Sequence, residues 1–162
     1  MDKHPSAITH LDWSEDSNYL HSNSTSYDIL YSDLKAKTFM PGGASALKDC
    51  EWHTWSATFG WHVQGVFRSE MDQSDINMVA RSNKKYGKGK SKYQILSTGD
   101  DDSLIRLYRY PCLEKNSGCV EGRGHAEHVT NTKWSSKDTY LYSAGGEDQC
   151  VMQWRVNSKG RR

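Results

Sequence analysis

A serine, a histidine and an aspartate near the C-terminus are residue types that could perform nucleophilic catalysis. Ser143, His125 and Asp148 match a hydrolase triad, in which an imidazole activates the hydroxyl and a carboxylate orients the imidazole. The serine stands in LYSAGG, however, without the Gly-x-Ser-x-Gly turn that exposes a nucleophile, and no segment resembles an oxyanion loop. Trp154 follows nearby, and a partly buried indole N–H and imidazole need partners that a serine and an aspartate supply. Because these catalytic features are missing, we expect that the chain is not an enzyme and that the polar groups of these residues satisfy one another.

The lysine-rich stretch KKYGKGKSK is the main candidate for binding. It spans residues 84–92 and shows no apolar periodicity, so we expect a basic loop. Such a loop would attract an acidic partner in a salt-dependent manner, although a solvated insertion between strands is the alternative. RNA could use the same charges with Tyr86 and Tyr93 for stacking, but nothing resembles an RNA-binding module. The candidate contact residues are Lys84, Lys85, Lys88, Lys90 and Lys92.

Two other clusters have simpler explanations than metal binding. The aspartates at 100–102 lack the alternating oxygen ligands and the distal Glu of a calcium loop, and Asp is a favoured turn residue. His53 and His62 lie among tryptophans, where packing is the expected role. The sequence therefore predicts no metal site and no cofactor.

Composition indicates one strand-rich globular chain. The 162 residues include six Trp and nine Tyr and lack Leu or Ala runs, which favours many short strands over long helices. The formal net charge of +1 gives no overall attraction to nucleic acid or to an anionic membrane. No apolar run approaches the length of a membrane-spanning helix. We expect neither nucleic acid nor membrane as a partner.

Strands must position these residues, and one strand pattern recurs along the chain. Its clearest copy has three strands separated by the polar turns SSKD and GGED, at residues 128–136, 139–146 and 150–156. Residues 7–34 repeat this layout. Between the two copies we expect a long aromatic strand pair at 51–67 bent at Gly60, a strand at 75–82, and a strand, turn and strand at 94–110.

The last repeat resembles a WD repeat, the four-stranded blade of a β-propeller, because it combines Gly124-His125, Ser143, Asp148 and Trp154 in order. This resemblance implies that His125, Ser143, Asp148 and Trp154 form a structural, hydrogen-bonded tetrad. Over most of residues 7–156 the chain also resembles the echinoderm microtubule-associated protein-like family. The segments typical of the last blades of that family are ITHLDWSEDSNYL, DILY, WHTWSATFGWHVQGVF, DINMVARS, LSTGDDDSLIRLYRYPC, HAEHVTNTKW and AGGEDQCVMQW.

Two repeats depart from the family pattern. In the first, Ser26 and Ser32 stand where an acidic turn residue and a Trp are usual. In the middle one, Tyr108 replaces the Trp, with Asp101 or Asp102 as its turn partner. Only the last repeat has a complete tetrad.

The resemblance implies an all-β fold of about three WD-repeat propeller blades that do not close a ring. The expected divisions are a degenerate first blade at 1–40, an atypical middle blade with the basic loop at 41–120, the last blade at 121–157 and a basic tail at 158–162. Because open sheet edges expose unpaired backbone groups, the remaining propeller blades of the same or another chain are expected partners.

The family also implies a function: a non-enzymatic microtubule-associated fragment whose blades bind tubulin. The implied location is the cytoplasm and cytoskeleton, including the ciliary or flagellar axoneme. The alternative is a WD-repeat scaffold that binds another protein without direct tubulin contact.

Overall fold

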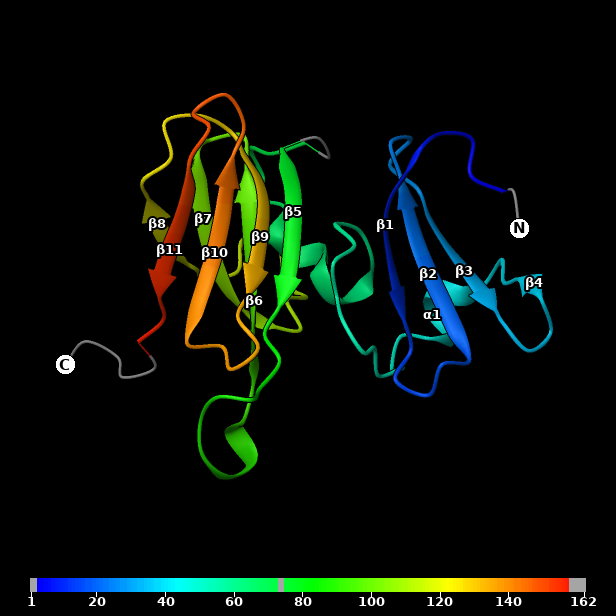
Figure 1. The fold of residues 1–162 in the computed structure, drawn as a ribbon. Helices are drawn as coiled ribbons and strands as arrows, with labels where there is room; N and C mark the ends of the chain where they lie inside the picture. The colour runs from blue at the N-terminus through cyan, green and yellow to red at the C-terminus, as the bar shows by residue number, and fades with distance from the viewer. Residues whose placement is uncertain (1–2, 73–74, 158–162) are drawn as a thin grey trace.

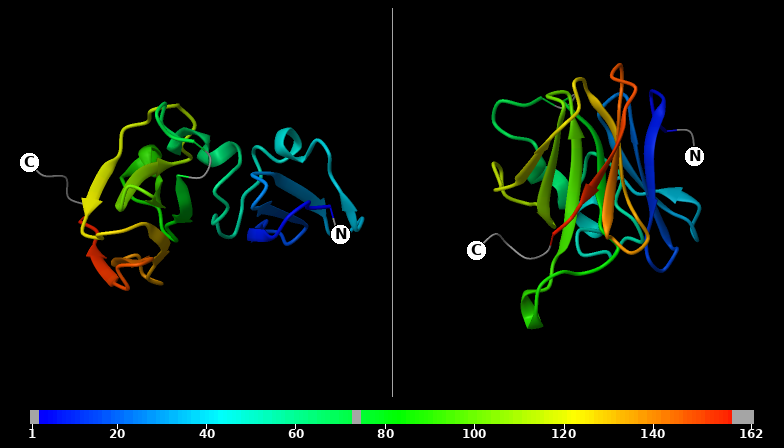
Figure 2. Two further views of the ribbon diagram at one scale, coloured as in Figure 1. Left: turned by 90° about the horizontal axis from the view of Figure 1, so that it is seen from above. Right: turned by 60° about the vertical axis from the view of Figure 1, so that its left-hand side comes forward.

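A computed structural model describes residues 3–72 and 75–157, which form three antiparallel sheets (Figures 1 and 2). The first sheet contains, in order, β1 (Ile8–Trp13), β2 (Tyr19–Ser24), β3 (Ile29–Asp33) and β4 (Thr38–Phe39). The second contains β5 (Ile76–Arg81), β6 (Gln94–Asp100), β7 (Leu104–Tyr110) and β8 (Val120–Arg123). The third contains β9 (Val129–Trp134), β10 (Tyr140–Gly145) and β11 (Val151–Arg155). The expected all-β blades in an open arrangement are confirmed, and the helical pieces are short: α1 (Gly43–Ala46) and the 3-10 helices η1 (Trp61–Val66) and η2 (Gly89–Ser91).

The first and last blades use the same turn chemistry after their first strand. Ser14 accepts hydrogen bonds from the backbone N–H groups of Asn18 and Tyr19, at 3.1 and 2.8 Å. Ser135 accepts equivalent bonds from Thr139 and Tyr140, both at 3.1 Å. A serine hydroxyl thus closes each polar turn and fixes the register of the strand that follows.

The apolar core lies between the sheets. One cluster, which includes Trp52, Trp55 and Leu96, joins the first and second sheets. A second cluster, which includes Val129 and Trp134, joins the second and third. Figure 2, in its left view, shows the third sheet beside the second and the first sheet across a connecting segment.

That connecting segment corrects one prediction, because residues 51–67 do not form a strand pair. They contain an isolated bridge between Ser14 and Trp52, followed by η1. The carboxylate of Asp12, on β1, accepts hydrogen bonds from the backbone N–H groups of Ser56 and Ala57, at 2.8 and 3.0 Å. A buried side chain therefore takes the place of a strand ladder for these donors.

The sheets also divide the chain differently from the repeats. β8 pairs with β7, from Leu104 with Arg123 to Leu107 with Val120, so it completes the second sheet. The boundary expected at residue 121 therefore falls inside a strand of the middle blade, and the third sheet has three strands with β11 at its edge. The tail expected at 158–162 lies outside the described residues.

Candidate structural tetrad and basic loop

The four tetrad residues of the last blade lie within hydrogen-bond distance of one another. His125 Nδ1 is 2.7 Å from Asp148 Oδ2, and His125 Nε2 is 2.7 Å from Ser143 Oγ. Trp154 Nε1 donates to the same Ser143 Oγ at 2.7 Å. β10 and β11 carry Ser143 and Trp154, the turn between these strands carries Asp148, and the connection between β8 and β9 carries His125.

These distances define a consistent set of donors and acceptors. The indole N–H can only donate, so the Ser143 oxygen accepts from it and donates its own proton to His125 Nε2. Nδ1 then carries the imidazole proton and donates it to Asp148. Hydrogen bonds from the Cys150 backbone N–H and from His125 lower the pKa of Asp148 and favour its charged form. A neutral histidine thus satisfies every polar side chain of the set.

The burial of the tetrad supports a structural role. Ser143 is 2% exposed and His125 7% exposed, and the serine oxygen already accepts the indole proton. A substrate carbonyl would have to reach a buried hydroxyl that has two partners. Gly124 permits this close packing, because a Cβ there would lie 2.8 Å from Met152 Sδ and 3.0 Å from the Trp154 ring.

The first blade contains three of the four groups. His4 Nδ1 is 3.0 Å from Asp28 Oδ2, and His4 Nε2 is 2.6 Å from Ser22 Oγ. The acidic position is therefore filled by Asp28 and not left to Ser26, which corrects our reading of this repeat. Ser32 does take the register position of the tryptophan, since it pairs with Leu20 as Trp154 pairs with Leu141. The sequence did contain a signal for this histidine. His4 stands four residues before Ile8, the start of an alternating strand, just as His125 stands four residues before Val129.

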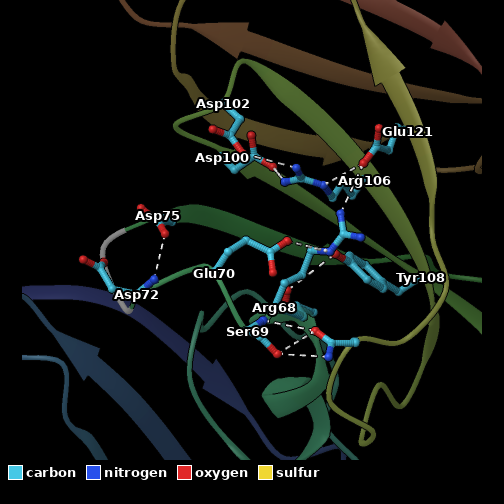
Figure 3. A network of polar contacts seen from close by, with 12 residues as sticks. Arg68, Ser69, Glu70, Asp72, Asp75, Asp100, Asp102, Arg106, Tyr108 and Glu121 are labelled. Atoms are coloured by element: carbon cyan, nitrogen blue, oxygen red, sulfur yellow. Dashed lines mark hydrogen bonds and ion pairs between the residues drawn. The ribbon is translucent and has the colours of Figure 1, made fainter.

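The middle blade replaces the tetrad with a buried ion network (Figure 3). Arg106 is 3% exposed, and its guanidinium contacts the buried carboxylate of Asp100, with Glu121 at 3.3 Å. Arg68 contacts the same Glu121 carboxylate at 3.5 Å. Burial raises the pKa of Asp100 to about 6, while the Leu104 N–H and Arg106 act in the opposite direction. The sequence did not predict that Arg106 is buried, because an arginine in an alternating strand is normally expected to face solvent.

The expected partners of Tyr108 are not observed. Tyr108 takes the register position of the tryptophan, opposite Leu96, but its hydroxyl lies 3.5 Å from the Val66 carbonyl. Asp102 contacts Arg106 at 3.3 Å, and Asp101 accepts from Asn77 at 2.6 Å. Neither aspartate therefore serves as the turn partner of this tyrosine.

The basic loop extends the β5–β6 hairpin and projects below the sheets in Figure 1. Tyr86 and Tyr93 exchange backbone hydrogen bonds of 2.6 and 2.9 Å, which narrow its base. Asp138, in the β9–β10 turn, accepts from Asn83 Nδ2 and from the Lys84 backbone N–H, both at 2.7 Å. The last blade thus holds the base of a loop that belongs to the middle blade.

The lysine charges of this loop are not neutralised by acidic side chains among the described residues. All five lysines are exposed, and none forms an ion pair with any residue that the structure describes. Lys84 differs from the other four, because its ammonium group donates to the Lys137 carbonyl. Lys85, Lys88, Lys90 and Lys92 are therefore the charges available to a partner.

Two further features are absent from residues 3–72 and 75–157. No group of three or more His, Cys, Asp or Glu side chains is placed to hold a metal ion. In the same residues, no helix is both long enough and apolar enough to cross a membrane.

Comparison with known proteins identifies the family. Residues 1–156 match the profile of the echinoderm microtubule-associated protein second beta-propeller. Human echinoderm microtubule-associated protein-like 1 is 40% identical over 153 residues, which cover 94% of this chain and 18% of that protein. Echinoderm microtubule-associated protein-like 4 of Xenopus tropicalis is 36% identical over 156 residues, covering 96% of this chain and 16% of that protein. The chain therefore spans less than a fifth of the length of these relatives.

A solved structure shares the fold. The crystal structure of the computationally designed Ika4 protein has a TM-score of 0.52 and 18% identity, covering 97% of this chain and 96% of that one. The strand arrangement, the blade tetrad and the match over residues 1–156 lead to one conclusion: the chain belongs to the second-propeller region of the echinoderm microtubule-associated protein family.

Proposed function

We propose that these blades associate with microtubules and that the basic loop at 84–92 contacts tubulin. The observation that carries the proposal is the group of four lysines that have no ion-pair partner in the described structure and stand on a loop whose base is fixed by Asp138. Relatives that are 36 to 40% identical are named microtubule-associated proteins, which supports the same partner. The tubulin surface, with its acidic tails, has the complementary charge.

The proposed contact is local and electrostatic. The formal net charge of the whole chain is only +1, so attraction must come from the loop and fade beyond about 8–10 Å at physiological salt. The proposal applies to microtubules of the cytoplasm and cytoskeleton. The ciliary or flagellar axoneme is not part of the proposal.

Cosedimentation with microtubules at two salt concentrations tests this function. The test variant replaces Lys85, Lys88, Lys90 and Lys92 by Ser. The control replaces four exposed lysines outside the loop, Lys35, Lys37, Lys115 and Lys133, and so changes the net charge equally. We expect the loop variant to bind more weakly with a flatter salt dependence, and the control to bind nearly as the parent does. Equal losses in both variants would contradict the loop assignment.

A scaffold that binds another protein is the second candidate, and one observation favours it. Ile8, Leu11 and Trp13 on β1 are 57, 49 and 47% exposed, which leaves an apolar face for another blade or a protein partner. Removal of the acidic tails of tubulin separates the two candidates. Direct electrostatic contact predicts weaker binding to tail-less microtubules, whereas a scaffold that reaches microtubules through another protein predicts no change.

A further inference from the structure

We propose that a groove beside the basic loop binds a short acidic peptide segment that carries an aromatic side chain. The inference deepens the proposed function and rests on it, because it assigns the acidic partner to one defined place on the surface. The groove has a volume of about 740 Å³ and lies between residues 48–54, the start of η1 and the base of the loop. Pockets of this size accommodate a few side chains of a bound ligand.

One wall of the groove is basic. Lys85 and Lys92 line it from the loop, whereas Lys88 and Lys90 stand at the tip of the loop and do not. Arg81 lies on the same wall, and its guanidinium donates to the Trp52 carbonyl and, at 2.9 Å, to the His53 carbonyl. Because carbonyl groups do not cancel its charge, Arg81 adds a fixed positive charge to the two mobile lysine charges.

Other parts of the lining are aromatic. Trp61 is 47% exposed at the groove, whereas Trp52 and Trp55 of the connecting segment are buried. Tyr110 and His62 stack with ring centroids 5.6 Å apart and planes 12° apart, and Arg81 lies 5.1 Å from the Tyr110 ring centroid. Exposed and stacked rings of this kind provide edges and faces against which a further aromatic ring can pack. We therefore place the aromatic side chain of the peptide at the end of the groove that Trp61 lines.

Acidic residues on the first-sheet side limit what can bind. Glu15, Asp49 and Glu51 line the groove there and outnumber the single lysine of that side, Lys48; His53 lies 3.2 Å from Glu15. These carboxylates would repel a ligand that is acidic along its whole length. The matching peptide has its carboxylates on one side of the aromatic residue, toward Lys85 and Lys92.

Fluorescence anisotropy with the full chain and a labelled peptide tests the groove. The probe is four glutamates adjoining one phenylalanine, made in both orders, and the reference peptide has alanine in place of phenylalanine. We expect Lys85→Ser with Lys92→Ser to raise the Kd about three- to tenfold, and Lys88→Ser with Lys90→Ser to raise it less than about twofold. Trp61→Ala should abolish the preference for phenylalanine over alanine. Since Trp61 is exposed, its removal should leave the circular dichroism unfolding midpoint unchanged.

The outcomes separate this inference from the proposed function. If the two lysine pairs weaken peptide binding equally, or if Trp61→Ala leaves the phenylalanine preference intact, the groove assignment is wrong while the loop remains a tubulin contact. If the groove effects are seen but neither lysine pair alters microtubule cosedimentation, the peptide site stands and tubulin is not its partner.

Discussion

Ser143 makes two hydrogen bonds that no other single atom of the last blade can replace. It accepts the proton of Trp154 and donates its own to His125, so removing the hydroxyl leaves a buried nitrogen and an indole N–H without partners. In the first blade, the Ser22 hydroxyl bonds to His4 and to no other side chain that the structure describes, because Ser32 stands at the tryptophan position. The two serines therefore differ in how many groups depend on them.

This difference predicts unequal costs for the same substitution. Ser143→Ala should lower the free energy of unfolding by about 2–4 kcal/mol, because each unsatisfied buried group costs about 1–3 kcal/mol. Ser22→Ala should cost about half as much. Urea denaturation followed by tryptophan fluorescence measures both, and Ser136→Ala, at an exposed site in the same blade, is the control. Equal effects of Ser143→Ala and Ser136→Ala would rule out the structural role of the tetrad.

His21 makes the stability of the fold depend on pH. It is fully buried among Tyr31, Trp52 and Trp55, and burial lowers its pKa to about 4 from an ordinary value of 6.5, although nearby Asp12 acts in the opposite direction. Between these two pH values the unfolded chain binds a proton at this residue and the folded chain does not. The free energy of unfolding therefore falls as the pH decreases from 6.5 toward 4, by about 3 kcal/mol from this residue.

Comparison with His21→Phe isolates that contribution. Asp100 has the opposite effect on the free energy of unfolding. Because its pKa is raised to about 6, it adds stability as the pH falls through that value. Asp100 is present in both proteins, so its effect cancels in the comparison. We expect the parent chain to lose more stability than the variant between pH 7 and pH 4 in urea titrations. Parallel pH profiles would show that His21 does not titrate as its burial implies.

At the scale of elements, the β9–β10 turn determines where the basic loop points. Asp138 is 2% exposed, and both of its carboxylate oxygens accept hydrogen bonds from the base of the loop. Tyr86 adds a hydrogen bond of 3.3 Å to the Asp138 carbonyl. The loop is therefore held by a neighbouring blade as well as by its own hairpin.

Loss of this anchor should release the loop. Asp138→Ala is expected to increase the rate of trypsin cleavage after the lysines at 84–92 several-fold, because proteases cut segments that open locally. Limited proteolysis with mass spectrometry of the fragments measures the rate at each lysine. Lys137→Ala changes a neighbouring side chain but keeps the backbone carbonyl that Lys84 uses, so its cleavage rate should match that of the parent.

The sequence predicted the strands well wherever apolar residues alternate between polar turns, as in β9 to β11. It failed at residues 51–67, where the aromatic side chains pack between two sheets and Asp12, more than forty residues away, binds the backbone N–H groups. The last-blade tetrad was expected from the resemblance to WD repeats, and the pairing of β10 with β11 sets the positions of Ser143 and Trp154. Arg106 and Asp100 could not be found in this way, since their burial depends on how β7 and β8 close the second sheet.

At the scale of the whole molecule, the first sheet exposes a face that the last sheet buries. Trp13 pairs with Leu20 as Trp134 pairs with Leu141, so the two tryptophans are equivalent in register. Trp134 is 7% exposed and donates to the Ala80 carbonyl of the neighbouring sheet at 2.9 Å, whereas Trp13 is 47% exposed. The exposed face of β1 is therefore equivalent to the face with which β9 packs against its neighbouring sheet, but no other described blade covers it.

An isolated chain of these 162 residues should self-associate through this face. Leu11→Ser with Trp13→Ser is expected to lower the average mass seen by sedimentation at micromolar concentration, because it removes exposed apolar area. Tyr142→Ser, at a residue 38% exposed in the third sheet, is the matched control. A parent chain that sediments as a monomer would contradict the expectation.

The position of the two apolar clusters has a consequence for cooperativity. Ile95 and Leu96 are neighbours on β6, yet Leu96 belongs to the cluster shared with the first sheet and Ile95 packs against the cluster shared with the third. Separating the second sheet from either the first or the third sheet would therefore expose one face of β6. The smallest region that can unfold independently is therefore a pair of sheets and their shared core, and amide protons of β6 should be the slowest of the chain to exchange with solvent. Truncation at a boundary between blades would cut through a core, so single blades of this chain are not expected to fold as separate domains.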